Sequence, residues 1–326
     1  MNSGITFPRK ISRANLGRGV GMEFRGRLAW FGLVASLLTA FVGGGGSSAA
    51  IASLLVLRPL SALLFAMALF SLTREQIRDS AALLTLAGAA LALVAAHLVP
   101  LPPTIWHNLP GRELIEANDR LAGLAGQWRP LSLDPPATRN ALFSLLLPIA
   151  TLLFTIQLSG SQLVKTVDLV LIGVLASAML GLLQILGDPE GPLYFYSITN
   201  NGAAVGLFAN RNHQALLLAA TLPMLAFWAS VGSRHGQPKA ISGDTGSAIR
   251  RKHARRWIAL GAALFVVPLL LVTGSRAGLL LGLVSIVSIP FVLLPDRAER
   301  EKGLQEHKMG RVLSFAAFAL LGSIVA

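Results

Sequence analysis

Stretches of 15 to 22 mostly apolar residues recur along the whole chain and constrain its fold more than any other feature. A helix needs about 20 such residues to cross the hydrocarbon core of a bilayer. Only 13% of the residues are charged, against about 25% in soluble domains. We therefore predict an all-α fold, a polytopic membrane helix bundle. The nine predicted spans are 28–42, 50–71, 80–100, 141–158, 166–187, 213–231, 257–273, 277–295 and 312–326.

The first predicted span follows the basic segment 1–27, and this order is also typical of a signal peptide. Residues 48–50, Ser-Ala-Ala, would then form the cleavage region. Further apolar runs follow at once, and the four glycines at 43–46 favour a flexible turn, so we interpret 28–42 as a span. The glycine run lacks the GK[ST] of a phosphate-binding loop.

The 28 Lys and Arg residues are divided unevenly between the two sides that these spans define. With a cytoplasmic N-terminus, 21 of them lie in cytoplasmic segments, chiefly 1–27, 232–256 and 296–311. Six lie on the opposite side, which is the asymmetry expected of membrane proteins. The net charge of +13 therefore reflects topology, and we expect no nucleic-acid partner. Residues 1–27 form a cytoplasmic segment in this interpretation, and 28–326 form one transmembrane domain.

Two outer loops, 101–140 and 188–212, are long enough to fold. Apolar residues recur at helical spacing in the first loop, with charged residues between them. This pattern predicts an amphipathic helix lying on the outer membrane–water interface. Its apolar residues are Leu114, Ile115, Leu121, Leu124 and Trp128.

Arg211 and Arg276 are the strongest candidates for a binding site. Arg211 belongs to a polar cluster, 210–214, that leads directly into an apolar run, and Arg276 lies in a short turn between two spans. Both are predicted at the outer ends of spans. The planar guanidinium fork suits phosphate, and its permanent charge can stabilise a phosphate leaving group. Each arginine is also consistent with an interfacial anchor, as is Arg139 at the entrance to the fourth span.

Other polar residues leave alternatives open. His213 is either a general base or the cap of the helix that starts there. Asp188 and Glu190 are either an acid–base pair or solvated loop charges. Arg58, beside Pro59 in the second span, is either functional, or it snorkels or is paired near a helix kink.

Asp168 and Gln184, near the ends of the fifth predicted span, are either part of a transport path or interfacial residues. The chain has no cysteine, and its six histidines are scattered. We therefore expect no metal site and no cofactor.

Three segments resemble known signatures. Residues 206–225, GLFANRNHQALLLAATLPML, resemble the GxFxNRNHxAxxLxxxLP signature of the O-antigen ligase/polymerase superfamily (the Wzy_C type). Residues 273–283, TGSRAGLLLGL, are similar to its second signature, SRxG at the start of a span. Residues 129–146, RPLSLDPPATRNALFSLL, look like the loop that enters the fourth span. Together these segments cover most of 100–290.

The resemblance implies a GT-C-like glycosyltransferase of the bacterial inner membrane, active on the periplasmic face in lipopolysaccharide biosynthesis. Such enzymes move a glycan from undecaprenyl pyrophosphate to the lipid A core (a ligase) or to a growing chain (a polymerase), without metal or nucleotide. On matching motif positions, Arg211 and Arg276 would hold the pyrophosphate. Supporting residues would be Asn210, Asn212, His213, Ser275 and Arg139.

The chain departs from this family at its end. Members have a large periplasmic loop after the SRxG helices, with a histidine implicated in catalysis, whereas this chain stops at Ala326 where that loop should begin. His307 is on the cytoplasmic side in the predicted topology and cannot replace it. The catalytic residue is therefore unknown, and we expect the chain to be incomplete. Two alternatives stay open: a membrane transporter of an anion or a lipid-linked sugar, and a non-catalytic scaffold.

Overall fold

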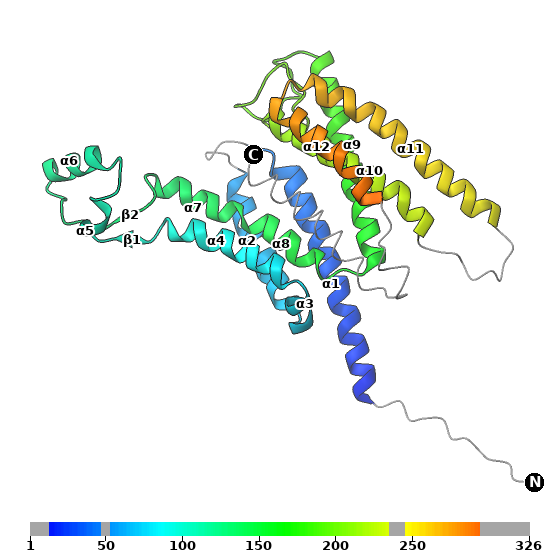
Figure 1. Cartoon of the computed structure of the whole chain (residues 1–326), viewed down its shortest axis with the longest axis horizontal. Coiled ribbons are helices and arrows are strands. Elements are labelled where there is room, and N and C mark those ends of the chain that lie inside the picture. Colours follow the sequence, from blue (N-terminus) through cyan, green and yellow to red (C-terminus); the bar gives the residue numbers. More distant parts are fainter. Residues whose placement is uncertain (1–12, 47–52, 235–244, 294–326) are drawn as a thin grey trace, which may run out of the picture.

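The structure is a computed structural model that describes residues 13–46, 53–234 and 245–293, and it is built mainly from helices (Figure 1). In chain order its elements are α1 (Arg13–Gly43), α2 (Leu54–Ser71), α3 (Arg74–Asp79), α4 (Ala81–Ala96), β1 (Pro100–Leu101), α5 (Pro103–Trp106), α6 (Glu113–Leu121), β2 (Arg129–Pro130), α7 (Pro135–Ser144), α8 (Leu146–Thr155), α9 (Gly160–Leu186), α10 (Arg211–Arg234), α11 (Thr245–Val272) and α12 (Arg276–Leu293). Strands β1 and β2 form a two-residue antiparallel pair with Pro100 opposite Pro130.

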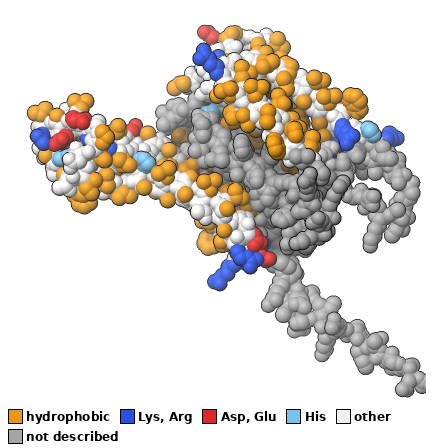
Figure 2. Space-filling model, in the orientation of Figure 1, with side chains coloured by type: hydrophobic (Ala, Val, Ile, Leu, Met, Phe, Trp, Pro, Cys, Tyr) orange, Lys and Arg blue, Asp and Glu red, His pale blue; other side chains and the backbone are white. Residues whose placement is uncertain are grey.

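Seven helical segments among the described residues are long and apolar enough to cross a bilayer. They are Phe24–Gly43, Leu54–Ser71, Pro135–Thr155, Gly160–Leu186, Arg211–Ser230, His253–Val272 and Arg276–Leu293. On the face in Figure 2, hydrophobic side chains cover much of the helical surface, and charged side chains gather at helix ends. The protein is therefore an all-α, multi-pass membrane protein, which confirms the predicted fold class.

The predicted span at 80–100 is shorter in the structure. Helix α4 has 16 residues, Ala81–Ala96, and ends in a turn in which Leu98 donates a backbone hydrogen bond to Ala95. Pro100, Pro102 and Pro103 follow and cannot donate the backbone hydrogen bonds of a continuing helix. The predicted span at 312–326 lies outside the described residues.

Two apolar cores hold the helices together. The first joins α1, α2 and α8 through buried residues that include Leu33, Leu64 and Phe154. A Cβ on Gly32 would stand 2.3 Å from the Phe154 ring, so this glycine lets α8 approach α1. The second core joins α9, α10 and α11. Its buried members include Val174, Ala178, Ala215, Leu218, Leu222, Val266, Leu269 and Leu270.

Helix α12 packs closely against α10 because two glycines face its neighbours. A Cβ on Gly278 would stand 2.3 Å from the Cβ of Ala215 in α10, and one on Gly282 would stand 2.8 Å from Leu270 in α11. Glycines spaced four residues apart let membrane helices approach closely. This packing sets α10 and α12 side by side. We call the end where both helices begin the outer end, and the opposite end the inner end.

The first outer loop folds into a small arm, residues 100–134 (Figure 1). Its helix α6 ends at Leu121, earlier than the pattern through Trp128 predicted. Gly123 adopts φ +73° there, and the Leu124 amide donates to the Asp119 carbonyl at 2.7 Å, which is a Schellman closure. Leu114, Leu121 and Trp128 are exposed, as an interfacial segment requires.

Buried polar contacts organise the arm. Trp106 is fully buried and its Nε1 donates to the Gln127 carbonyl at 3.0 Å. The Asp119 carboxylate, also buried, accepts two hydrogen bonds from the guanidinium of Arg129. These hydrogen bonds hold the pKa of Asp119 below its ordinary value, although desolvation opposes them.

Candidate functional site

The polar cluster predicted at 210–214 forms the start of α10. Asn210 caps this helix, since its Oδ1 accepts the Asn212 amide at 2.8 Å. The Arg211 amide donates to Asn200 Oδ1 at 3.1 Å, so the second outer loop is tied to the same turn. The Arg211 side chain is exposed. The backbone and the cap therefore fix the helix start and leave the guanidinium accessible.

The TGSRAG segment forms a tight turn into α12. Thr273 and Ser275 are buried, and Ser275 Oγ accepts the Gly278 amide at 3.0 Å, which caps the helix. Gly274 adopts φ +64°, a conformation that residues with a Cβ rarely take. Arg276 is the first residue of α12 and its side chain is exposed.

The structure brings these two segments together. The Nη1 atom of Arg211 lies 3.6 Å from where a Cβ on Gly274 would stand. Arg211 and Arg276 are thus the first residues of two neighbouring helices that begin at the same end.

Positive charge gathers at the starts of α10 and α12. A helix N-terminus carries about half a positive charge and disfavours cations nearby. Within the described residues, neither Arg211 nor Arg276 forms a salt bridge with a carboxylate. Two arginines added to two N-termini make this end favourable for a multiply charged anion.

Gln184 shapes the loop that leads to Arg211. It is buried, and its Nε2 donates to the carbonyls of Leu193 and Gly206 at 2.9 and 3.0 Å. Its Oε1 accepts the amides of Val205 and Gly206 at 3.1 and 2.7 Å. Gln184 lies two residues before the end of α9, as the interfacial alternative predicts, and its side chain is a buried support for the loop.

Two further buried polar side chains, Ser177 and Gln214, lie beside Gly206, which Gln184 also contacts. Ser177 Oγ donates to Gln214 Oε1 at 2.7 Å and accepts the Leu207 amide at 3.1 Å. Gly206, at φ +58°, fits against both side chains because its missing Cβ would lie 2.4 Å from Ser177 Oγ. Sequence reasoning missed Ser177. Its signal is the seven-residue spacing from Gln184, which puts two polar residues on one face of α9.

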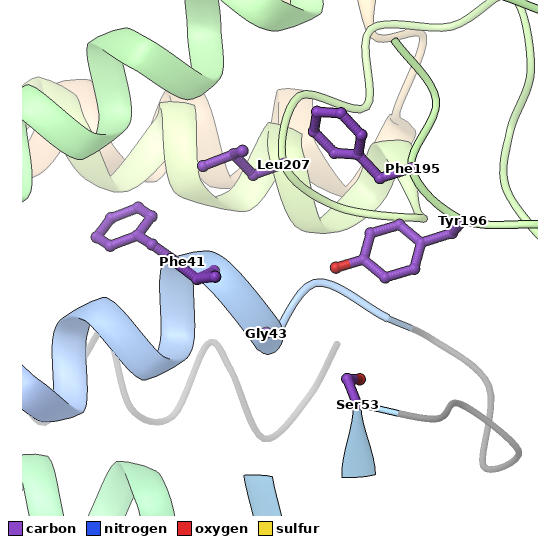
Figure 3. Close-up of a pocket in the computed structure, with 7 residues that line it drawn as sticks. Phe41, Gly43, Ser53, Phe195, Tyr196 and Leu207 are labelled. Atoms are coloured by element: carbon purple, nitrogen blue, oxygen red, sulfur yellow. The ribbon is translucent and has the colours of Figure 1, made fainter. Parts of the chain in front are cut away.

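A pocket of about 510 Å³ opens beside this loop at the outer end of α1 (Figure 3). Its lining is mostly apolar: Phe41, Val42, Gly43, Ser53, Phe195, Tyr196 and Leu207. Burial raises the pKa of the Tyr196 hydroxyl, and a hydrogen bond with the Gly45 backbone opposes the shift.

The glycines after α1 form a packed turn at this pocket. A Cβ on Gly45 would stand 2.1 Å from the Leu207 carbonyl oxygen, and the Gly45 carbonyl accepts the Ala209 amide at 2.7 Å. The predicted turn is present, and at Gly45 it packs against the second outer loop. These contacts join the end of α1 to the second outer loop.

The other candidate site residues lie in different surroundings. His213 is half-buried with its ring edge-on to Phe208, and the helix cap proposed for it is provided by Asn210 instead. Arg139 is exposed on α7. Helix α7 packs chiefly against α2, α4 and α8, so Arg139 stands apart from the starts of α10 and α12. Asp188 accepts the Glu190 amide at 2.9 Å and both are exposed, which favours a solvated turn.

Two charged residues within spans have partners. Arg58 lies near the outer end of α2, donates to Asn140 Oδ1 and has its guanidinium carbon 5.9 Å from the centre of the Phe143 ring. Asp168 accepts a hydrogen bond from Trp228 Nε1 at 2.5 Å near the inner end. Both arrangements favour a structural role.

Comparisons with protein-family models, curated proteins and solved structures found no match to this chain. Among the described residues, no group of three or more acidic, histidine or cysteine side chains could hold a metal ion. Two observations therefore bear on function: the geometry of the outer end, and the resemblance of the two segments that meet there to the signatures named above.

Proposed function

We propose that this protein is a membrane glycosyltransferase of the O-antigen ligase/polymerase type, which takes its glycan from undecaprenyl pyrophosphate. The observation that carries the proposal is the approach of Arg211 to the turn at Gly274, with Nη1 3.6 Å from the position of an added Cβ. It joins the NRNH and SRAG segments, on which the resemblance rests, although 62 residues lie between Arg211 and Gly274 in the sequence. The bacterial inner membrane and a periplasmic active face belong to the same proposal.

In the proposed reaction, an acceptor hydroxyl attacks the anomeric carbon of the donor glycan. The new C–O bond forms as the bond to pyrophosphate breaks, and undecaprenyl pyrophosphate leaves with the electron pair. The hydroxyl proton passes to a base, to which no described residue is assigned. Arg211 and Arg276 would bind the pyrophosphate and stabilise the charge that develops on it.

The surroundings suit such a donor. The pocket lined by Leu207 is mostly apolar, so it can take part of an isoprenoid chain. The arginines are exposed, as reaction with a large glycan requires. The acceptor is lipid A core for a ligase or another glycan chain for a polymerase.

Reconstitution of the protein with an undecaprenyl-pyrophosphate-linked glycan and acceptor tests the proposal. Arg211→Ala and Arg276→Ala should each lower transfer by at least 100-fold, about the loss seen when one charge-stabilising group is removed. Arg120→Ala is the matched control, because Arg120 is an exposed outer arginine paired with Glu116. Its transfer should be unchanged.

Undiminished transfer by both arginine variants would refute the proposed site. Accumulation of the donor inside vesicles without any glycan product would instead indicate a transporter of a lipid-linked sugar. Parallel measurement of membrane insertion separates loss of chemistry from loss of fold.

A further inference from the structure

Helix α11 carries a basic run where it enters the predicted membrane span. The run includes Arg250, Arg251, Lys252, Arg255 and Arg256, and the apolar span starts within it, at His253. Basic clusters next to a span attract anionic lipid headgroups. Within this run, the structure describes the side chains of Arg250, Arg255 and Arg256.

One face of α11 is occupied by packing. The Arg255 guanidinium carbon lies 5.1 Å from the centre of a Trp228 ring, and Trp228 in turn donates to Asp168. Ala259, Val266 and Leu270 continue this face and are buried. Arg255 therefore helps to join α9, α10 and α11.

The other face is open. His253, Arg256, Trp257 and Leu260 surround a shallow hollow of about 220 Å³. His253 and Arg256 are exposed, and Trp257 is 70% exposed. Tryptophan with its ring in the interface and arginine with its head in the aqueous layer are typical of a membrane boundary.

The hollow continues into an exposed apolar stripe. Leu264 and Leu271 are 67% and 59% exposed, and they follow Leu260 at helical spacing along the same face. A Cβ on Gly261 would meet no atom within 4 Å, so nothing in the described chain covers this part of the helix. A ligand that fills the face must combine an anionic head with apolar chains.

We propose that this face of α11 binds an anionic phospholipid of the leaflet at the inner end. Arg256 and His253 bind its phosphate, Trp257 packs at the level of the glycerol backbone, and the acyl chains lie along Leu260, Leu264 and Leu271. A free phosphate would leave the stripe uncovered. This assignment is independent of the glycosyltransferase proposal.

The test uses the full chain, purified in mild detergent and titrated with dioleoyl phosphatidylglycerol, with dioleoyl phosphatidylcholine as the neutral counterpart. Native mass spectrometry counts the retained lipids. We expect phosphatidylglycerol to be retained in preference, and Arg256→Gln to weaken its apparent affinity about fivefold, the effect of one basic residue near a membrane surface. Arg78→Gln, which removes the same charge from an exposed site at the inner end, should leave the affinity unchanged.

The double variant His253→Ala/Trp257→Ala is a second test of the same hollow and should also weaken phosphatidylglycerol binding. Size-exclusion chromatography checks that each variant is folded. Equal retention of the two lipids, no effect of either α11 variant, or an equal effect of Arg78→Gln would overturn the proposal. Displacement of the lipid by inorganic phosphate would also overturn it.

Discussion

The guanidinium of Arg211 lies against the turn that contains Gly274, with Nη1 3.6 Å from the position of an added Cβ. Ala at position 274 would place a methyl group in contact with this arginine. It would also force a side chain into φ +64°, at a cost of about 1–2 kcal/mol.

We therefore expect Gly274→Ala to lower both stability and glycan transfer. Gly111→Ala is the matched control, because Gly111 has φ +78° and no atom within 4 Å of an added Cβ. It should lower stability alone, as measured by thermal unfolding in detergent. Equal transfer by the two variants would show that the contact with Arg211 has no functional role.

Gly278→Ala should separate α10 from α12. The added Cβ would stand 2.3 Å from that of Ala215, so one helix must move, and overpacking of this kind costs about 1–3 kcal/mol. Gly88→Ala in α4 adds the same methyl group in open space and should be neutral or stabilising. Thermal unfolding of the two variants gives the comparison, and equal midpoints would refute close packing of α10 and α12.

Gln184→Leu should loosen the loop before α10. The variant leaves the Gly206 amide without its acceptor, at about 1–3 kcal/mol for a buried amide left unpaired, whereas the Val205 amide keeps its hydrogen bond to the Ala203 carbonyl at 2.9 Å. Protease cleavage within 188–210 should become faster. The exposed Gln127, changed to Leu, serves as the control, and an unaltered cleavage rate in the Gln184 variant would contradict the assigned support role.

The arm at 100–134 should lose stability in acid. Since hydrogen bonds from Arg129 lower the pKa of Asp119, the ionised carboxylate stabilises the fold above its ordinary pKa of 3.8. This contribution is lost as the pH falls from about 3.8 through the lower folded pKa. Fluorescence of buried Trp106, obtained by subtracting a Trp106→Phe variant, should report the change. Asp119→Asn should remove this acid dependence, whereas the exposed Asp134, changed to Asn, should retain it.

Arg58 and Asn140 should show energetic coupling. Each single Ala variant removes the hydrogen bond between α2 and α7 and should cost about 1.5–3 kcal/mol. The double variant should cost clearly less than the sum, because both single changes remove the same contact. Thermal unfolding of all four proteins completes the cycle. Additive losses would instead restore the functional alternative for Arg58.

The sequence predicts the helical elements well because the membrane imposes a strong pattern on them. Counting spans placed Arg211 and Arg276 at the same end, and the structure joins their turns. The end of α6 was not predicted correctly, because the apolar spacing continues to Trp128 whereas Gly123 ends the helix. A local backbone signal there outweighs the periodicity.

Long-range polar pairs were not predictable. Nothing in the order of residues shows that Asp119 meets Arg129, or that Gln184 bonds Gly206 across 22 positions. Such pairs depend on how the loops return to the bundle. Gly45 is a similar case, since a run of four glycines suggests freedom, and only the close Leu207 carbonyl reveals a packed turn.

Gln184 also bears on the order in which helices enter the bilayer during synthesis. When α9 first emerges, its amide has none of its partners, which lie nine to 22 residues further along the chain. A polar group left unpaired in hydrocarbon is costly. The segment that supplies the partners also anchors the start of α10. We therefore expect α9 and α10 to be released from the translocation machinery together, as a helical hairpin.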